Sequence, residues 1–298
     1  MKTTIIIGER YTALLKNNLN RFGLEVLPLP DNPEIAPDLA GHTDLSVFYP
    51  GKKEIFLAGY LKNTEFTEEL AGKGLHVQYI REKQTPEYPS DVPLNVRLLS
   101  GNRVLLNRKT VSKQILQYFE AKKTASESGE FGDKLDGNYT NSGIKDDSFI
   151  GGNSKNLRIK DENKIDDNLK NSRITDDSNC KSIEIIDVNQ GYSACTTLDC
   201  RYGIISSDNG ICEAARKHGL KVLQISQGFI SLPGYSYGFI GGSAFLLENK
   251  MFFTGSLQNH PDRDRILSFL SAGGIEPIYL TNEEIFDIGG AVLISFPP

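Results

Sequence analysis

A short phrase occurs four times in this chain and constrains its fold more than any other feature. It is a glycine followed by mostly apolar residues, as in the stretch GLKVLQI that begins at Gly219, and the other copies begin at Gly23, Gly74 and Gly274. Glycine readily adopts the left-handed conformation that ends a helix, and the run after it suits a short strand. Copies spaced by about fifty residues, or multiples of fifty, predict a repeat architecture.

The residues around each phrase predict one order of elements: strand, hairpin, strand, helix, strand. The first strands of the second and fourth units are expected at 44–49 and 194–198. The first unit lacks such a strand, whereas a strand at 291–296 is left over. Pairing it beside residues 5–7 gives five equal units in a ring that the two chain ends close, which leaves few free sheet edges.

Residues 122–179 interrupt the third unit. They are rich in Asn, Asp, Lys, Ser and Gly, with few aromatic residues and isolated apolar ones. A segment of this composition cannot bury enough apolar surface to offset the entropy cost of ordering, so we expect a disordered, low-complexity insertion. The expected organisation is a single domain over residues 1–298 with this insertion inside it.

Composition and charge exclude several classes of function. The 298 residues are 39% hydrophobic, which is enough for a large core, and the net charge is −5 with no basic run, so no nucleic-acid partner is expected. No apolar run approaches the ~20 residues of a membrane helix, and the start is too short for a signal peptide. The four cysteines show no close metal-ligand pairing, so we expect no metal, no cofactor and a cytoplasmic location with free thiols. The oligomeric state stays open.

The five units resemble the pentein fold, the five-bladed pseudo-symmetric α/β propeller of the guanidino-group-modifying enzymes. Arginine deiminase, dimethylarginine hydrolase, amidinotransferase and agmatine deiminase belong to this superfamily, as does a non-catalytic ribosome anti-association factor. The string NQGYSAC at 189–195, with the segments 206–208, 232–235 and 237–242, is similar to a bacterial branch that lacks the usual cysteine of the closing unit. Residues 288–292 read IGGAV, with alanine where the enzymes have cysteine.

The resemblance implies a cysteine-dependent hydrolase or amidinotransferase-like enzyme that acts on a small cationic guanidino compound at one mouth of a central channel. A thiolate needs a nearby base, and a planar cation suits carboxylate partners. The residues that this implies as catalytic are Cys195, His42 and Asp44. Those implied as substrate-binding are Asp287, Asn189 and Tyr192.

Each candidate also has a plainer interpretation. Cys195 could be a packing residue, because free cysteine is often buried as a small apolar side chain. Asp44 could end a loop with His42 in solvent, and Asp287 could be a turn residue. The alternative function is a non-catalytic module on the same fold that binds a small molecule or interacts with a protein or ribosome.

Overall fold

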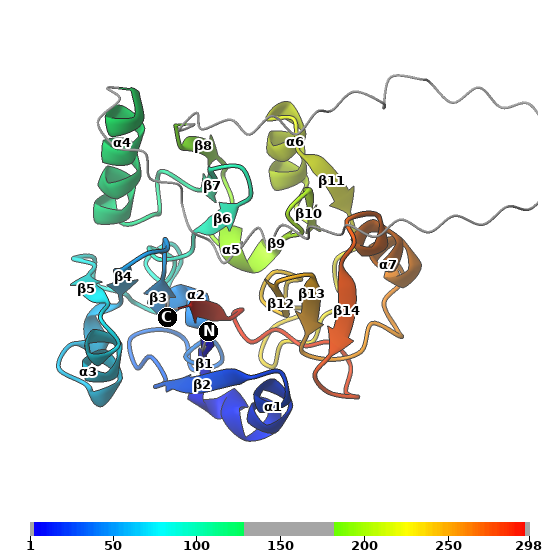
Figure 1. Cartoon of the computed structure of the whole chain (residues 1–298), viewed down its shortest axis with the longest axis horizontal. Coiled ribbons are helices and arrows are strands. Elements are labelled where there is room, and N and C mark those ends of the chain that lie inside the picture. The colour runs from blue at the N-terminus through cyan, green and yellow to red at the C-terminus, as the bar shows by residue number, and fades with distance from the viewer. Residues whose placement is uncertain (1–2, 128–181, 296–298) are drawn as a thin grey trace, which may run out of the picture.

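The computed structural model describes residues 3–127 and 182–295 and shows a mixed α/β fold with five small, separate sheets (Figure 1). Each sheet has three strands. In spatial order, sheet by sheet, they are β15 (Val292–Ser295), β1 (Thr3–Gly8) and β2 (Leu24–Leu29); β3 (Val47–Phe48), β4 (Glu54–Leu57) and β5 (His76–Tyr79); β6 (Arg97–Leu99), β7 (Arg103–Leu106) and β8 (Glu184–Asp187); β9 (Thr197–Asp199), β10 (Gly203–Ser206) and β11 (Lys221–Gln224); and β12 (Ala244–Leu247), β13 (Lys250–Phe253) and β14 (Glu276–Tyr279).

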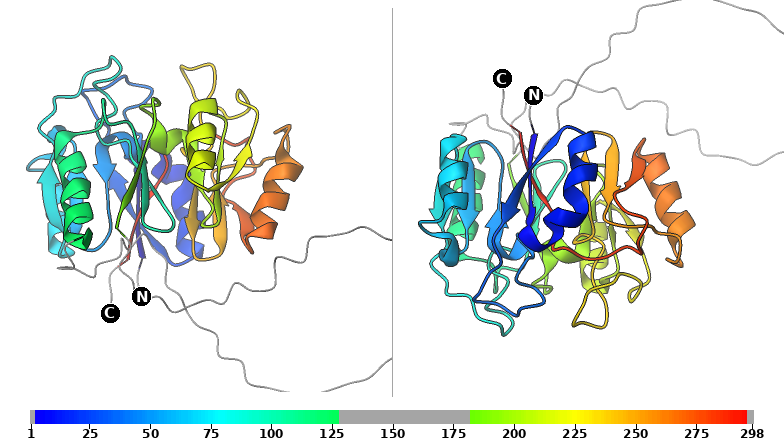
Figure 2. Two further views of the ribbon diagram at one scale, coloured as in Figure 1. Left: turned by 90° about the horizontal axis from the view of Figure 1, so that it is seen from above. Right: turned by 90° about the horizontal axis from the view of Figure 1, so that it is seen from below.

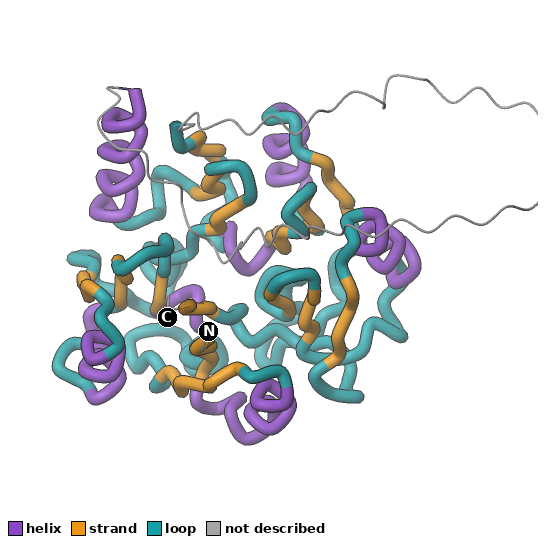
Figure 3. The backbone as a smooth tube through the Cα atoms, in the orientation of Figure 1, coloured by secondary structure: helices purple, strands orange, loops and turns teal. Residues whose placement is uncertain are grey.

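In every sheet the middle strand pairs antiparallel with one neighbour and parallel with the other. A helix lies between the two parallel strands in the chain, because parallel neighbours need a crossover connection. These helices are α1 (Glu9–Arg21), α3 (Glu65–Gly72), α4 (Lys113–Glu127), α6 (Asn209–Lys217) and α7 (Arg263–Ala272). They lie on the outside of the strands (Figure 3). The order within each sheet is therefore the order that the sequence predicts.

The last strand of the chain pairs with the first. β15 runs antiparallel to β1, with Leu293 opposite Ile5 and Val292 opposite Ile6. Figure 2 shows the first and last strands side by side. The expected pairing of residues 291–296 with residues 5–7 is thus present over 292–295.

The glycines that open the four repeated phrases adopt the conformation expected of them. Gly23, Gly74, Gly219 and Gly274 have φ values between +67° and +85°. A Cβ added at any of the four would meet no atom within 4 Å, so the requirement for glycine comes from the backbone conformation and not from crowding. Each glycine ends a helix and turns the chain into a strand.

In two units a short helix takes the place of the start of the predicted first strand. Helices of four residues, α2 (Thr43–Ser46) and α5 (Ser193–Thr196), stand where the sequence predicts strand, and β3 and β9 start directly after them. Every residue of both helices is buried. One helical turn is too short to show a 3.6-residue period, so its apolar residues predict a strand from sequence alone. A short 3-10 helix, η1 (Gly59–Leu61), was not predicted either.

The boundary of the expected insertion also differs. Helix α4 continues to Glu127, so the first residues of the expected insertion, 122–127, are helical. The other residues of the expected insertion, 128–179, lie outside the described part of the chain. Among the described helices, none combines the length and apolar character that crossing a membrane requires.

Neighbouring sheets share apolar clusters, which fixes their positions relative to one another. One cluster contains Ile6 of β1, Val47 of β3 and Ile55 of β4, and therefore spans two sheets. Another joins Phe48 of β3 to Leu106 of β7. Because each cluster is shared by two sheets, moving one sheet would also expose apolar surface on its neighbour. Exposing that surface costs about 25 cal/mol per Å².

Candidate active site

The short helices α2 and α5 bring an aspartate and a cysteine together near the middle of the molecule (Figure 1). The amide of Asp44 in α2 donates to the carbonyl of Gly289 at 3.0 Å. The carbonyl of Cys195 in α5 accepts from the amide of Gly242 at 2.9 Å. Backbone hydrogen bonds to two glycine-rich segments thus fix both helices.

The thiol of Cys195 has a hydrogen-bond partner on each side. Its Sγ lies 2.8 Å from Oδ2 of Asp44, to which the S–H donates. Nδ2 of Asn95 donates to the same sulfur at 3.2 Å, while Oδ1 of Asn95 accepts from the amide of Ala194 at 2.6 Å. All these side chains are buried. Asn95 therefore positions both the thiol and the helix that carries it.

His42 and Asp287 lie beside this pair and are almost fully buried, at 2% and 1% exposure. The amides of Phe239 and Gly289 each donate to the Asp287 carboxylate at 2.8 Å. Gly289 has a φ of +70°, and a Cβ added there would lie 2.3 Å from Cβ of His42. A Cβ added at Gly242 would lie 1.9 Å from Oδ1 of Asp287. The absence of a side chain at Gly289 and Gly242 thus makes room for His42 and Asp287 respectively.

His42, Asp44, Cys195 and Asp287 form what we call the buried cluster. Potential ligand atoms of the first three lie within 4.8 Å of one another. The attraction between Asp287 and His42 raises the pKa of His42 and lowers that of Asp287, whereas burial has the opposite and larger effect on each. The cluster therefore gathers a thiol, an imidazole and two carboxylates in one buried place.

Burial sets the protonation states of the cluster. It raises the pKa of the Asp44 carboxyl to about 7, against the hydrogen bond from Cys195. It raises the pKa of the Cys195 thiol well above its usual range, and the charge of Asp44 adds to this effect. It also raises the pKa of Asp287 and lowers that of His42. At neutral pH the thiol and the imidazole are therefore uncharged, and Asp44 is only partly ionised. A bound cation would favour the ionised acids.

Cys195 and His42 open onto a cavity of about 270 Å³, which we call the thiol cavity. Its wall is formed by Leu39, His42, Tyr192, Cys195, Leu232, Tyr235, Ser236, Tyr237, Phe239 and Asp287. The rings of Tyr192 and Phe239 stack with their centroids 6.4 Å apart. The hydroxyl of Tyr192 donates to the Asp91 carboxylate, which fixes this wall.

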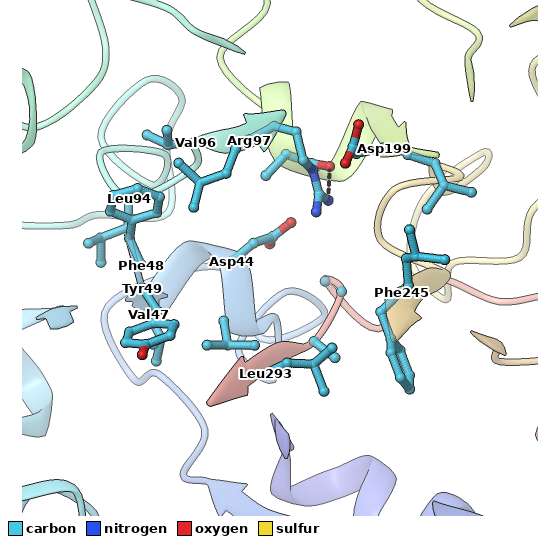
Figure 4. Close-up of a pocket in the computed structure, with 18 residues that line it drawn as sticks. Asp44, Val47, Phe48, Tyr49, Leu94, Val96, Arg97, Asp199, Phe245 and Leu293 are labelled. Carbon is cyan, nitrogen blue, oxygen red and sulfur yellow. Dashed lines mark hydrogen bonds between the residues drawn. The ribbon is translucent and has the colours of Figure 1, made fainter. Parts of the chain in front are cut away.

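Asp44 lines a second cavity of about 160 Å³, which we call the central cavity (Figure 4). Residues of β3, β6, β9, β12 and β15 line it. Figure 4 shows the Asp44 carboxylate pointing toward the guanidinium of Arg97. Arg97 donates to the carbonyls of Ala194 and Gly241 at 2.5 and 3.2 Å, and its charge lowers the pKa of Asp44 against the larger effect of burial. Asp44 thus lines the central cavity, while its Oδ2 contacts the Cys195 sulfur that lines the thiol cavity.

A sequence model for a family described as "Family of unknown function (DUF6873)" matches residues 6–126 and 153–292. The chain belongs to this family. Among curated proteins, none matches the sequence.

Three solved structures are similar to this DUF6873 chain. An adduct of dimethylarginine dimethylaminohydrolase with S-methyl-L-thiocitrulline is 9% identical, covers 99% of this chain and 100% of its own, and has a TM-score of 0.49. The citrulline complex of DDAH from Pseudomonas aeruginosa has 9% identity, the same coverages and a TM-score of 0.47. Agmatine deiminase from C. jejuni has 8% identity, coverages of 93% and 87%, and a TM-score of 0.41. Dimethylarginine hydrolase and agmatine deiminase are also enzymes of the superfamily that the sequence resembles. At these scores the likeness carries no residue role to this chain.

In the DUF6873 chain, five of the six candidate residues gather around Cys195. Asp44 lines the central cavity, whereas Cys195, His42, Asp287 and Tyr192 line the thiol cavity. The sixth candidate, Asn189, is exposed and lies outside the wall of both cavities, with its carbonyl accepting from Nδ2 of Asn107 at 2.9 Å. The roles of these residues stay predictions.

Two residues of the site were missed from the sequence. Asn95 and Arg97 both fall in the strand expected at 94–99, where polar residues alternate with apolar ones. A signal was nevertheless present, because Asn95 lies just before the first strand of its unit, as Asp44 and Cys195 do. Comparing the polar residues at this place in all units would have found it.

The buried cluster could also hold one metal ion, although the sequence predicts none. His42, Asp44 and Cys195 offer nitrogen, oxygen and sulfur ligands within 4.8 Å of one another. In the described part of the chain, Nε2 of His42 and Oδ1 of Asp44 are buried without a hydrogen-bond partner. Three protein ligands with one open position are typical of a catalytic zinc site.

Proposed function

We propose that this chain is a cysteine-dependent hydrolase or amidinotransferase-like enzyme that acts on a small guanidine or amidine cation. The observation that carries the proposal is the 2.8 Å contact between Cys195 Sγ and Asp44 Oδ2, inside a buried cluster with His42 and Asp287. A thiol that only fills space needs no buried carboxylates or imidazole beside it, since burying them costs free energy. Perturbed acids and bases grouped at a cavity are typical of functional sites.

The proposal includes the scaffold, a closed five-bladed α/β propeller around the central cavity. The five three-stranded sheets and the pairing of β15 with β1 support it. In this arrangement α2 and α5 belong to different blades and meet at the middle. Closure matters for the site, because Gly289 precedes β15 and holds both the Asp44 amide and the Asp287 carboxylate.

A bound cationic substrate supplies the positive charge that the described wall of the thiol cavity lacks. Asp287 accepts two backbone hydrogen bonds and retains lone pairs for the N–H groups of a planar cation in the thiol cavity. A cation there favours ionisation of Asp44 and Cys195, whose pKa values burial holds high. The substrate thus activates the nucleophile that attacks it.

In the first chemical step, the Cys195 thiol gives its proton to Oδ2 of Asp44 and the sulfur attacks the central carbon of the substrate. The C–S bond forms while the electron pair of the C=N bond moves to nitrogen. A C–N bond then breaks, and the leaving amine takes a proton from Asp44. The enzyme is left with an amidino group on the Cys195 sulfur.

In the second step, water attacks this carbon. His42 is uncharged at neutral pH because burial lowers its pKa, so it can accept the proton of the water. The C–O bond forms, the C–S bond breaks and the thiol is protonated again. The product is a ureido compound from a guanidine, or an amide from an amidine. An amine in place of the water would make the enzyme a transferase.

A ureido-product assay with a panel of guanidines and amidines tests the proposal. Cys195→Ala should lower turnover by at least about 10³-fold, because it removes the nucleophile. Cys200→Ala is the matched control, since Cys200 is an equally buried free thiol outside the cluster. Turnover that survives in Cys195→Ala contradicts the mechanism. A protein that turns over none of the panel but holds a small molecule or protein favours the non-catalytic module.

Metal binding by the same cluster is the second candidate function, because His42 Nε2 and Asp44 Oδ1 are buried without hydrogen-bond partners in the described residues. Metal analysis of the purified protein decides between the two. One transition-metal ion per chain, with loss of turnover after chelation, supports a metal enzyme. Metal-free protein with full turnover excludes this role.

The proposal also keeps the other expectations from the sequence. The described cysteines are free, and a thiol nucleophile needs a reducing compartment, which agrees with a cytoplasmic location. The proposed partner is a small cationic molecule, and the proposal involves neither nucleic acid nor a membrane.

A further inference from the structure

We infer that the substrate is a guanidine or amidine without a carboxylate group, so that the site selects an amine-type cation and rejects an amino acid. This inference rests on the proposed function, because it names the substrate class of the same site. It comes from the charges and surfaces around the thiol cavity.

The wall of the thiol cavity carries a carboxylate but no lysine or arginine among the described residues. A substrate carboxylate in this cavity would need a charged or multiple hydrogen-bond partner, because an unpaired buried charge is costly. More negative charge lies at the tyrosine-lined part of the wall, since Asp38 and Asp91 both act on Tyr235. A carboxylate tail would therefore meet repulsion as well as the lack of a partner.

Two arginines are close enough to influence the buried cluster, and both are engaged elsewhere. Arg10 donates to both oxygens of Asp31, at 2.6 to 3.2 Å, and to the carbonyl of Pro37 at 2.9 Å. Arg97 lines the central cavity, where it donates to the carbonyls of Ala194 and Gly241. Neither arginine lines the thiol cavity, so neither is placed to receive a substrate carboxylate there.

The rest of the wall suits the alkyl part of a small cation. Tyr192, Tyr237 and Phe239 contribute aromatic rings in contact with one another, and Leu39 and Leu232 add apolar surface. Aromatic faces attract cations and also pack against methylene groups. The cavity volume of about 270 Å³ lies just below the usual range of small-molecule sites, about 300–1,000 Å³, which favours a short substrate.

A matched ligand series tests the inference through binding alone. Calorimetry with the full-length Cys195→Ser variant would use butylguanidine, 4-aminobutylguanidine and 4-guanidinobutanoate, which share the guanidine and differ at the tail. We expect the carboxylate compound to bind at least about tenfold more weakly than butylguanidine, and the amine compound to bind at least as tightly as butylguanidine. Equal or tighter binding of 4-guanidinobutanoate overturns this inference and leaves the proposed function intact. Failure of all three to bind overturns both.

A charge placed on the cavity wall gives a second, independent readout. Tyr235 lines the cavity and is 46% exposed, so Tyr235→Arg should fold and supply the missing cation. It should improve binding of 4-guanidinobutanoate at least about fivefold relative to 4-aminobutylguanidine. Phe229→Arg is the control, because Phe229 is 50% exposed and lies outside the cavity wall. An equal shift in both variants would mean that overall charge, and not the wall of the cavity, sets the preference.

Discussion

The central cavity and the thiol cavity differ in whether a cationic side chain lines their wall. On the central side, Arg97 provides a cation whose charge lowers the pKa of Asp44. On the thiol side, Asp287 and Cys195 are acids, and no lysine or arginine of the described chain lines the wall. Asp44 thus lines a cavity that contains a cationic side chain, whereas its partner Cys195 lines one that contains none among the described residues.

This difference indicates what each cavity is for. The wall of the central cavity combines apolar strand residues with its own cationic side chain, Arg97. The charge of Asp44 therefore has a counter-charge there without a ligand. A cavity that holds buried acids with raised pKa values becomes more stable when a cation enters it. We therefore assign a structural role to the central cavity and propose that the thiol cavity binds the cationic substrate.

The largest expected effect separates the two carboxylates of the central cavity. Asp44→Asn should lower turnover by about 10²-fold or more, because Asp44 takes the thiol proton. Asp199→Asn should change it by less than about threefold, since Asp199 lies outside the buried cluster and accepts from Ser100 at 3.1 Å. Steady-state rates on one guanidine give the comparison. Equal losses in both variants would show that the central cavity takes part in the chemistry.

A second effect concerns stability against pH. The pKa of Asp44 is about 7 in the folded chain and near the ordinary value of 3.8 in the unfolded chain, so between these values the folded chain retains a proton that the unfolded chain has lost. Stability therefore falls as pH rises through this window and then levels off.

Asp44→Asn removes this dependence. The variant should therefore be more stable than the natural chain, and the difference in the free energy of unfolding should grow as the pH rises to 7. It should reach at most about 4 kcal/mol. Urea unfolding at about pH 4.5 and pH 7.5 measures the difference. Parallel behaviour of the two proteins at both pH values would contradict the raised pKa.

The smallest effect comes from the cation of the central cavity. Arg97 lowers the pKa of Asp44, so Arg97→Gln should raise it and move the acid limb of the pH–rate profile upward by less than about one pH unit. Arg97→Lys keeps the charge and should stay closer to the natural profile. A downward shift in Arg97→Gln would mean that Arg97 does not act on Asp44 through its charge.

The sequence predicts the elements of this fold well because they repeat. Strands and helices recur in one order, and the glycines with positive φ mark the end of a helix in four units. The pairing of the last strand with the first follows from counting strands, and the hydrogen-bonded register confirms it over residues 292–295. A repeat gives several chances to recognise each element, which a single unit does not.

The site could be predicted only in part, because tertiary contacts build it. The sequence proposed Cys195, His42 and Asp44 together, and these three lie within 4.8 Å of one another. It could not reveal the helical turns that carry Asp44 and Cys195, since four residues show no period. Asn189 was expected at the pocket, but it is exposed and lines neither cavity.

The central claim is that a cation in the thiol cavity activates Cys195, and alkylation by two matched reagents tests it most directly. Chloroacetamidine carries the cation and chloroacetamide does not, and in both cases the Cys195 sulfur displaces chloride. Mass spectrometry identifies which cysteine is labelled. The labelling rate with each reagent is divided by the rate at which the same reagent labels free cysteine at the same pH. We expect the amidine to label Cys195 at least about tenfold faster on this scale, while Cys200 and Cys212 show no such preference. Equal normalised rates at Cys195, or a preference shared by all three thiols, would contradict the account.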